Sequence, residues 1–240
     1  MAHFNDLPVS DRLLIARRGT AYFDQALGAL ADDDFTGESL LLGWSRRHVV
    51  AHIGYNAAAL CRLMDWASTG VETPMYESAE HRNHEITEGA TLSSAVLRNL
   101  FARNVSRLNR KWSHVPESAW TAQVRTAQGR LVPASETAWM RTREVWIHAV
   151  DLDNGGQFGD FPTVVLNSLL SDIVDMWRRK QLGAGLMLAV DGRSPVSVGA
   201  DSPVTATISG SLAGVVRWAA GRGSVGVDIQ GDLQAPPRWL

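Results

Sequence analysis

Apolar residues recur at helical spacing through roughly the first two thirds of the chain. Over residues 10–30 they repeat every three or four positions, which is the period of an amphipathic helix. Ser10 or Asp11 is a suitable N-cap for this helix. The same spacing predicts a helix from Ser45 to a stop at Gly70, a shorter helical piece over 75–90, and a long helix over 92–112.

After the long helix the pattern changes from helical spacing to alternation, and then returns to helical spacing. Residues 121–135 alternate around a Gln-Gly turn, as in a short hairpin. Residues 136–153 are again helical and end at Asn154-Gly155-Gly156. The four main helices are joined by short links, which favours antiparallel neighbours. The pattern therefore predicts an up-and-down four-helix bundle over residues 1–156.

A different pattern follows Gly159. A helix over 161–180 precedes short alternating segments that are typical of strands, with a second short helix between them. This mixture predicts an α+β unit over 157–240, sandwich-like in form. It lacks the glycine-rich fingerprint of a doubly wound nucleotide-binding fold. The fold class expected for the whole chain is α+β with two domains. The expected strands are 186–192, 196–200, 204–210 and 225–232, and the second helix is 211–222.

Composition, net charge and cysteine content exclude several classes of protein but do not identify the function. The chain has 240 residues, 45% hydrophobic and 20% charged, which are ordinary values for a globular protein. A net charge of −2 gives no reason to expect nucleic acid as a partner. The start of the chain does not resemble a signal peptide, and no apolar run is long enough to span a membrane. The single Cys61 excludes an internal disulfide, so we expect a reducing cytoplasm.

Candidate chemistry begins with a carboxylate and an imidazole on one helix. Glu144 and His148 are four residues apart, so both project from the same helical face. The residues between and after them are apolar or aromatic: Val145, Trp146, Ile147, Ala149 and Val150. An isolated carboxylate is strongly unfavourable in such surroundings. A bound metal cation would satisfy both side chains.

A third ligand must come from another helix, and His52 is the best candidate. It lies within an apolar helical stretch over 49–60. Two imidazole nitrogens and one carboxylate oxygen form the ligand set of several catalytic zinc sites. Spacing alone leaves two other interpretations open: His52 as a hydrogen-bonded core residue, and Glu144–His148 as a simple side-chain contact.

The remaining candidates have plainer interpretations. His48 follows two arginines, which favours an exposed position, and His81 and His84 lie in a polar run typical of a solvated face. Asp151 comes one turn after His148 and is placed either to accept that imidazole's second proton or to sit at an exposed helix end. Cys61 is expected on the helix face opposite His52, as a small core residue.

Three segments together resemble one family. LLGWSRRHVVAHIGYNAAAL, at 41–60, resembles the entry to the second helix of DinB-like metal-binding bundles, where Gly-Trp precedes a helix with a histidine ligand. RTREVWIHAVDLD, at 141–153, resembles the fourth-helix motif of the mycothiol-dependent branch. VVRWAAGRG and VGVDIQGD resemble the small C-terminal domain of the maleylpyruvate isomerases in that branch. The resemblance covers nearly the whole chain.

The resemblance implies both a reaction and the residues for it. His52, Glu144 and His148 would bind one divalent ion, zinc, and mycothiol would be the thiol cofactor. The reaction would be cis–trans isomerisation of maleylpyruvate to fumarylpyruvate, in the gentisate branch of aromatic degradation. Arg222 matches a family arginine of the active site. Near the site we expect Arg82 and Asn83 as cofactor-binding residues, and the tryptophans Trp44, Trp139 and Trp146 either lining the cleft or packing in the core.

Two other functions remain compatible with the same sequence. A mycothiol S-transferase would present nearly the same site but would consume the thiol. Alternatively, the bundle would hold a structural or sensing metal while the C-terminal domain, distantly like a sterol-carrier fold, serves as a lipid-binding module. The expected oligomeric state is a monomer.

Overall fold

The structure, a computed structural model, describes residues 2–199, 202–232 and 235–239. It divides into two compact units. One is Leu7–Gly156, and the other joins Met1–Asp6 to Gln157–Leu240. Residues 2–6, expected in the bundle, pack instead in the second unit. There Phe4 is buried and its backbone N–H donates to Ser168 Oγ at 2.7 Å.

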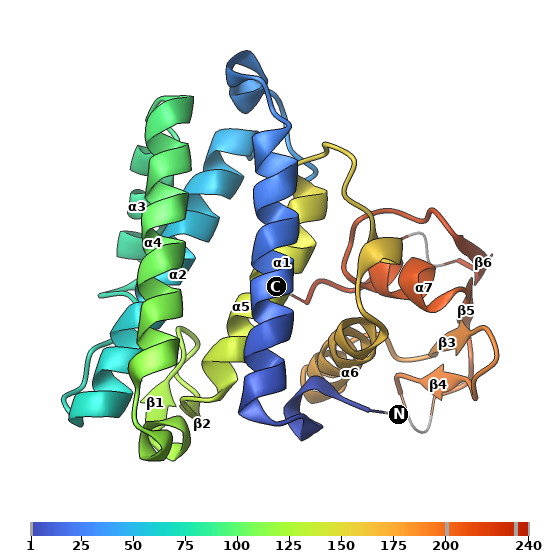
Figure 1. The fold of residues 1–240 in the computed structure, drawn as a ribbon. Coiled ribbons are helices and arrows are strands. Elements are labelled where there is room, and N and C mark those ends of the chain that lie inside the picture. The colour runs from blue at the N-terminus through green and yellow to red at the C-terminus, as the bar shows by residue number, and fades with distance from the viewer. Residues whose placement is uncertain (1, 200–201, 233–234, 240) are drawn as a thin grey trace. The chain divides into compact units, whose positions relative to one another are not determined.

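The first unit is built around four long helices, drawn from blue to yellow-green in Figure 1. α2 packs against both α4 and α5, and α1 packs against α5. α3 lies along α2, and a two-stranded hairpin precedes α5. The elements are α1 (Val9–Gly28), α2 (Arg46–Thr69), α3 (Ala79–Gly89), α4 (Ser94–His114), β1 (Gln123–Arg125), β2 (Leu131–Pro133) and α5 (Glu136–Asp151).

The bounds of α2 follow from its end residues. Ser45 is the N-cap, and His48 closes a capping box, its Nδ1 accepting the Ser45 backbone N–H at 3.2 Å. Gly70 ends the helix in the left-handed conformation, with φ of +74°, which glycine adopts at little cost. Between these ends α2 buries most of its length. Ser45 and Gly70 are the ends expected from the sequence.

A glycine sets the distance between α1 and α5. A Cβ added at Gly19 would lie 2.5 Å from Trp146 Nε1 and 2.7 Å from Val145 Cγ2. The two helices therefore approach closely where the first has no side chain. The Trp146 indole stacks on Tyr22 at a ring-centroid distance of 5.0 Å. This contact holds α5, which carries Glu144 and His148, against α1.

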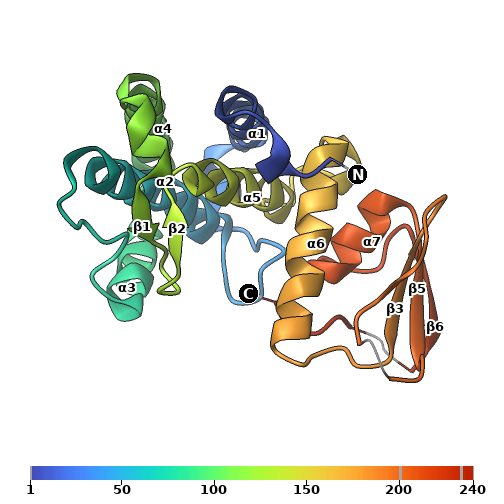
Figure 2. The same ribbon diagram turned by 90° about the horizontal axis from the view of Figure 1, so that it is seen from below.

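The second unit is a four-stranded sheet with two helices on one side of it, as Figure 2 shows. The strand order is β4-β3-β5-β6. β3 and β5 are parallel, and the other pairs are antiparallel. The elements are α6 (Thr163–Arg179), β3 (Leu186–Val190), β4 (Val196–Ser197), β5 (Ala206–Gly210), α7 (Leu212–Ala219) and β6 (Val227–Gly231).

Two tryptophans dominate the core of this unit. Trp177 of α6 and Trp218 of α7 are both fully buried and meet edge to face at 6.3 Å. Trp177 Nε1 donates to the Pro237 carbonyl at 2.9 Å, which anchors the C-terminal segment. Ser211 caps α7 by accepting the Gly214 N–H at 3.1 Å. The helices and the sheet thus share one apolar layer.

The predicted α+β fold class is confirmed, with differences at element ends. α1 begins at Val9 after Pro8 rather than at a polar cap, because proline fixes φ near the helical value and needs no donor. The strand expected over 196–200 is β4, of two residues, and Ala200 lies outside the described residues. Among the described residues, no helix combines the length and the apolar character that a membrane span requires.

We predict that Gly19→Ala destabilises the bundle, because a methyl group at this position overlaps Trp146 and Val145. Overpacking of this kind typically costs about 1–3 kcal/mol. The measurement is the denaturant midpoint, followed by circular dichroism. Gly28→Ala is the matched control, since it lies at the end of the same helix with nothing within 4 Å of an added Cβ. The control should be neutral or slightly stabilising. Equal midpoints for the two variants would contradict the proposed close contact.

Candidate metal centre

Three side chains converge between α2 and α5. His52 comes from α2, and Glu144 and His148 come from α5. One ligand atom from each lies within 4.8 Å of the other two. Glu144 Oε2 is 2.8 Å from His52 Nε2 and 3.2 Å from His148 Nε2. The two imidazole rings are perpendicular, with centroids 5.0 Å apart, so both Nε2 atoms face the same carboxylate.

The helices explain this convergence. Glu144 and His148 share a face of α5 because they are one turn apart. That face packs against α2 at His52, which is nearly buried. The Glu144 side chain keeps 21% of its surface exposed. The cluster is therefore mostly buried, and Glu144 is its most exposed member.

Opposing effects set the charge on Glu144 and His52. Burial alone would raise the pKa of Glu144, but the two imidazoles outweigh it and hold that pKa well below its usual value. Burial lowers the pKa of His52, and the attraction of Glu144 offsets this in part. Because a carboxylate only accepts hydrogen bonds, the Nε2–H of His52 is the donor in the 2.8 Å contact with Glu144.

Asp151 bonds the ring nitrogen of His148 that points away from Glu144. The His148 Nδ1–H donates to Asp151 Oδ2 at 2.7 Å, and Asp151 is fully buried. Burial lowers the pKa of His148, but the hydrogen bonds to Asp151 and Glu144 outweigh it and raise the pKa to about 9. Of the two positions open to Asp151 from the sequence, the structure confirms the one behind the imidazole. In metal sites a hydrogen bond of this kind at one ring nitrogen orients the imidazole so that its other nitrogen faces the ion.

The residues fit a divalent cation. Two neutral imidazoles and one carboxylate are a set that zinc takes in catalytic sites, where a fourth position stays open to water or substrate. Here the carboxylate between two Nε2 atoms supplies the negative charge. The carboxylate of Asp151 supplies the acceptor that orients one imidazole. The exposed part of Glu144 is where an external ligand can enter.

A buried arginine supports the centre from the opposite side. Arg141 lies three residues before Glu144 on α5, and 1% of its surface is exposed. Its Nη1 donates to the Ile53 carbonyl at 2.8 Å and to Asn56 Oδ1 at 2.9 Å, both on α2. Burial lowers its pKa to about 10, so it stays charged at neutral pH. Arg141 was not expected from the sequence, because it stands in the polar stretch 141–144, where nothing distinguishes a buried arginine from an exposed one.

One further cation reaches the centre from α3. Arg82 Nη2 lies 3.4 Å from His52 Nδ1, and Arg82 Nη1 donates to Asn83 Oδ1 at 3.3 Å. The guanidinium carbon lies 5.8 Å from the ring centroid of Tyr76. Burial raises the pKa of Tyr76 to about 12. Arg82 thus lies beside His52, and Asn83 is exposed next to it on α3. Tyr76 carries no sequence signal because it lies in a loop.

The aromatic residues named from the sequence divide into two groups. The Trp44 ring meets His52 edge-on at 5.6 Å and is partly exposed. Trp139 and Trp146 are buried, as expected for residues that pack in the core rather than line a cleft.

Other candidates lie outside the cluster. His48 is engaged with Ser45 at the start of α2. His84 is exposed and His81 half-buried on α3, and neither joins a metal-binding group in the described part of the chain. Cys61 is fully buried and burial raises its pKa, so it is a core residue.

Arg222 lies in the second compact unit, in the turn after α7. Its carbonyl accepts from Arg217 Nε at 2.7 Å, and its Nη1 donates to the Ala220 carbonyl. These contacts define its position within that unit. The three residues of the cluster belong to the other unit.

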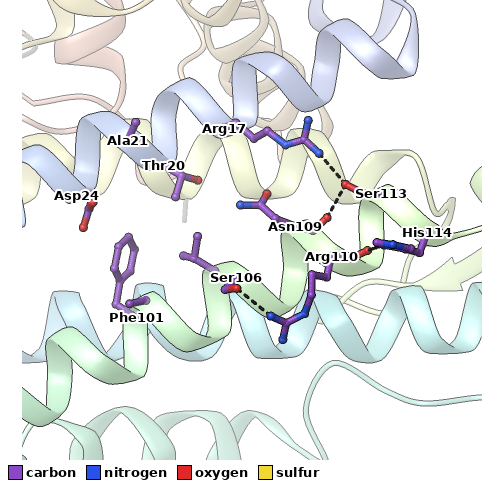
Figure 3. A pocket seen from close by; sticks show the side chains of 12 residues that line it. Arg17, Thr20, Ala21, Asp24, Phe101, Ser106, Asn109, Arg110, Ser113 and His114 are labelled. Carbon is purple, nitrogen blue, oxygen red and sulfur yellow. Dashed lines mark hydrogen bonds between the residues drawn. The ribbon is translucent and has the colours of Figure 1, made fainter.

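A separate groove of about 750 Å³ runs between α1 and α4. Figure 3 shows Phe101 at one end of this groove, and Arg17, Asn109, Arg110 and His114 toward the other. Two of its arginines bond serines that also line it: Arg17 bonds Ser113 at 3.2 Å and Arg110 bonds Ser106 at 3.0 Å. The groove contains none of the three cluster residues.

We predict that the ion-free chain loses stability as pH rises from about 6.5 to about 9. The folded-state pKa of His148, about 9, exceeds its usual 6.5. Protonation therefore stabilises the folded chain fully below pH 6.5, and this contribution is lost as pH passes the folded pKa. The expected loss is about 1–3 kcal/mol, measured by denaturant unfolding after chelation. Asp151→Asn should flatten the profile, and an unchanged profile in that variant would contradict this assignment.

Comparisons with known proteins agree with this architecture. Residues 16–153 match the family model described as the mycothiol maleylpyruvate isomerase N-terminal domain, and residues 160–238 match the MDMPI C-terminal domain. A crystal structure of the mycothiol-dependent maleylpyruvate isomerase is 49% identical, covers 100% of both chains and superposes with a TM-score of 0.96. The H52A mutant of that isomerase gives the same values. A search of curated proteins finds no match.

Family models cover both parts of the chain, and a structure nearly half identical to it matches over the full length. The chain therefore belongs to the mycothiol maleylpyruvate isomerase family.

Proposed function

We propose that this chain is an isomerase that converts maleylpyruvate to fumarylpyruvate with mycothiol as its thiol cofactor. The observation that carries the proposal is the cluster of His52, Glu144 and His148 in a chain whose full length matches the isomerase structure. In this proposal the bundle over 1–156 holds the ion, and the α+β domain over 157–240 contributes to substrate binding.

Zinc is the proposed ion, one per chain, because the donor set is two imidazoles and one carboxylate. When bound, such an ion lowers the pKa of a coordinating thiol so that it is present as thiolate. The chain's own thiol, Cys61, is buried and absent from the cluster. The nucleophile must therefore come from outside the protein, which is the role of mycothiol.

The substrate's chemistry explains the need for a thiol. A conjugated C=C bond must lose its double-bond character before the two halves can rotate. Mycothiol supplies a thiolate whose addition leaves a single bond free to rotate and whose elimination restores the double bond in the trans form. Atoms and electrons balance over the cycle, and the thiol is regenerated.

The chain's residues are proposed to hold the anionic groups that this reaction involves. Arg222 is the proposed catalytic residue: a guanidinium pairs in a bidentate fork with a carboxylate or with the enolate that forms on addition. Arg82 and Asn83 are proposed to line the place where mycothiol and substrate meet. Arg82 lies beside His52 in support of this role.

The setting follows from the same chemistry. We propose the gentisate branch of aromatic degradation as the source of substrate, and the reducing cytoplasm as the compartment, since a thiol cofactor must stay reduced. A monomer is proposed because the cluster takes all three ligands from one chain.

The test is turnover of maleylpyruvate by the purified, zinc-containing protein, followed by ultraviolet absorbance with and without mycothiol. We expect activity that requires mycothiol and leaves its concentration unchanged. Stoichiometric consumption of the thiol would identify an S-transferase instead. Full activity after complete removal of metal would rule out the proposed role of the cluster.

We predict that His52→Ala loses bound zinc and isomerase activity together, because His52 supplies one of three ligands. Zinc content by elemental analysis and turnover by absorbance measure the two losses. His48→Ala is the matched control: it removes an imidazole one turn earlier on the same helix, where His48 bonds Ser45. The control should keep its zinc. Equal loss in both variants would point to helix damage rather than ligand loss.

We also predict that Arg222→Ala lowers kcat/KM about 100-fold, as expected when one charged donor is removed from a reacting anion. Zinc content should stay at the wild-type value, because Arg222 is not a member of the ligand cluster. Arg222→Lys should recover part of the rate, since it keeps the charge but not the fork. Wild-type kcat/KM in Arg222→Ala would remove this residue from the mechanism.

A further inference from the structure

The two histidines of the cluster differ in what their outer nitrogens face. His148 Nδ1 lies 2.7 Å from Asp151 Oδ2, a carboxylate acceptor. His52 Nδ1 lies 3.4 Å from Arg82 Nη2. A metal-bound histidine normally donates its second ring N–H to a carboxylate, a carbonyl or water. Among the described residues, the side chain bonded to this nitrogen of His52 is a guanidinium.

The pairing of Arg82 with His52 depends on which of the two groups can accept a hydrogen bond. Arginine carries only donors, and a neutral imidazole carries one donor and one acceptor. In the structure the Nε2–H of His52 donates to Glu144, and Nδ1 of the same ring accepts from Arg82. Once Nε2 binds an ion through its lone pair, the ring hydrogen resides on Nδ1. Two donors then face each other, and neither can accept from the other.

The surroundings hold Arg82 in place. Its guanidinium carbon lies 5.8 Å from the Tyr76 ring centroid, and its Nη1 donates to Asn83. Arg62 lies against the same ring at 5.7 Å and is fixed to the Met75 carbonyl by its Nε at 2.8 Å. Arg82 is half-buried, so its charge is only partly screened by water. A single acceptor with negative charge satisfies both facing donors.

We propose that Arg82 and the Nδ1–H of His52 together bind one carboxylate group of the substrate. The inference rests on the proposed function, since it requires an ion at His52 Nε2 and a substrate with carboxylates. It gives Arg82 a role distinct from that of Arg222: Arg82 positions one end of an unsaturated dicarboxylate beside the metal ligands. The free protein's Arg82–His52 bond is exchanged for this contact when the ion binds.

The experiment measures binding of maleate, an unreactive cis-dicarboxylate, to the zinc-containing protein by calorimetry in the absence of any thiol. Hydrogen bonds to charged groups contribute about 1.5–3 kcal/mol. Arg82→Met should therefore weaken the maleate Kd at least about 10-fold. Arg82→Lys should recover part of the loss. The KM for maleylpyruvate should rise in Arg82→Met more than kcat falls.

Two controls separate this role from general damage. Arg62→Met removes the second guanidinium that lies against the Tyr76 ring, and it should leave the maleate Kd within about twofold of wild type. Zinc affinity of Arg82→Met should be unchanged or tighter, because the lost neighbour is itself a cation. Weaker zinc binding in that variant would show that Arg82 supports the ligands rather than the substrate, and would overturn the proposal.

The remaining outcomes distinguish this inference from the proposed function. A wild-type maleate Kd in Arg82→Met overturns the carboxylate subsite, with water then acting as the acceptor, even if isomerase activity is found. Maleate binding that depends on Arg82, without mycothiol-dependent isomerisation, supports the subsite and refutes the function. If Arg82→Met fails to fold, Arg82→Lys decides: an unchanged maleate Kd and unchanged KM overturn the proposal.

Discussion

The carboxylate of Glu144 is the group on which the centre of the bundle depends. A carboxylate enclosed among apolar helices is strongly unfavourable unless opposite charges or hydrogen-bond donors surround it. Here the Nε2 atoms of His52 and His148 approach the same oxygen. If either imidazole moved away, the carboxylate would lose a hydrogen-bond partner. The contact between α2 and α5 therefore forms at these three residues. Because this carboxylate requires positive charge beside it, the space between the three side chains also suits a divalent cation.

Packing elsewhere in the bundle holds α5 in the position that brings Glu144 and His148 to His52. Gly19 lets α1 approach α5 closely, with Trp146 filling the contact. Arg141 ties α5 to α2 through Ile53 and Asn56, one turn from Glu144. A buried arginine is costly, and its two hydrogen bonds to the neighbouring helix offset that cost. The result is a rigid pair of helices, which is what a site built from side chains of both requires.

Charge around the cluster is arranged asymmetrically. On one side Asp151 orients His148 and adds a buried negative group. On the other side Arg82 brings a positive group to His52 from α3, next to Tyr76. The negative side favours holding a cation, and the positive side favours an anion that approaches it. An isomerase that acts on a dicarboxylate with a thiolate needs both kinds of neighbour.

The sequence by itself determined the helices, the change of pattern near Gly156 and the pairing of Glu144 with His148, because these depend on local periodicity. Spacing left the place of His52 open, and the resemblance of its segment to metal-binding bundles supplied it. Only the tertiary structure decided that His52 faces Glu144 and that Asp151 bonds the outer nitrogen of His148. It also decided that Arg141 bonds Asn56 on α2 and that Arg82 reaches His52. Those contacts join residues from different helices or select one rotamer among several. Helical periodicity states which face a residue occupies, but the partner of that face is set by how the helices pack.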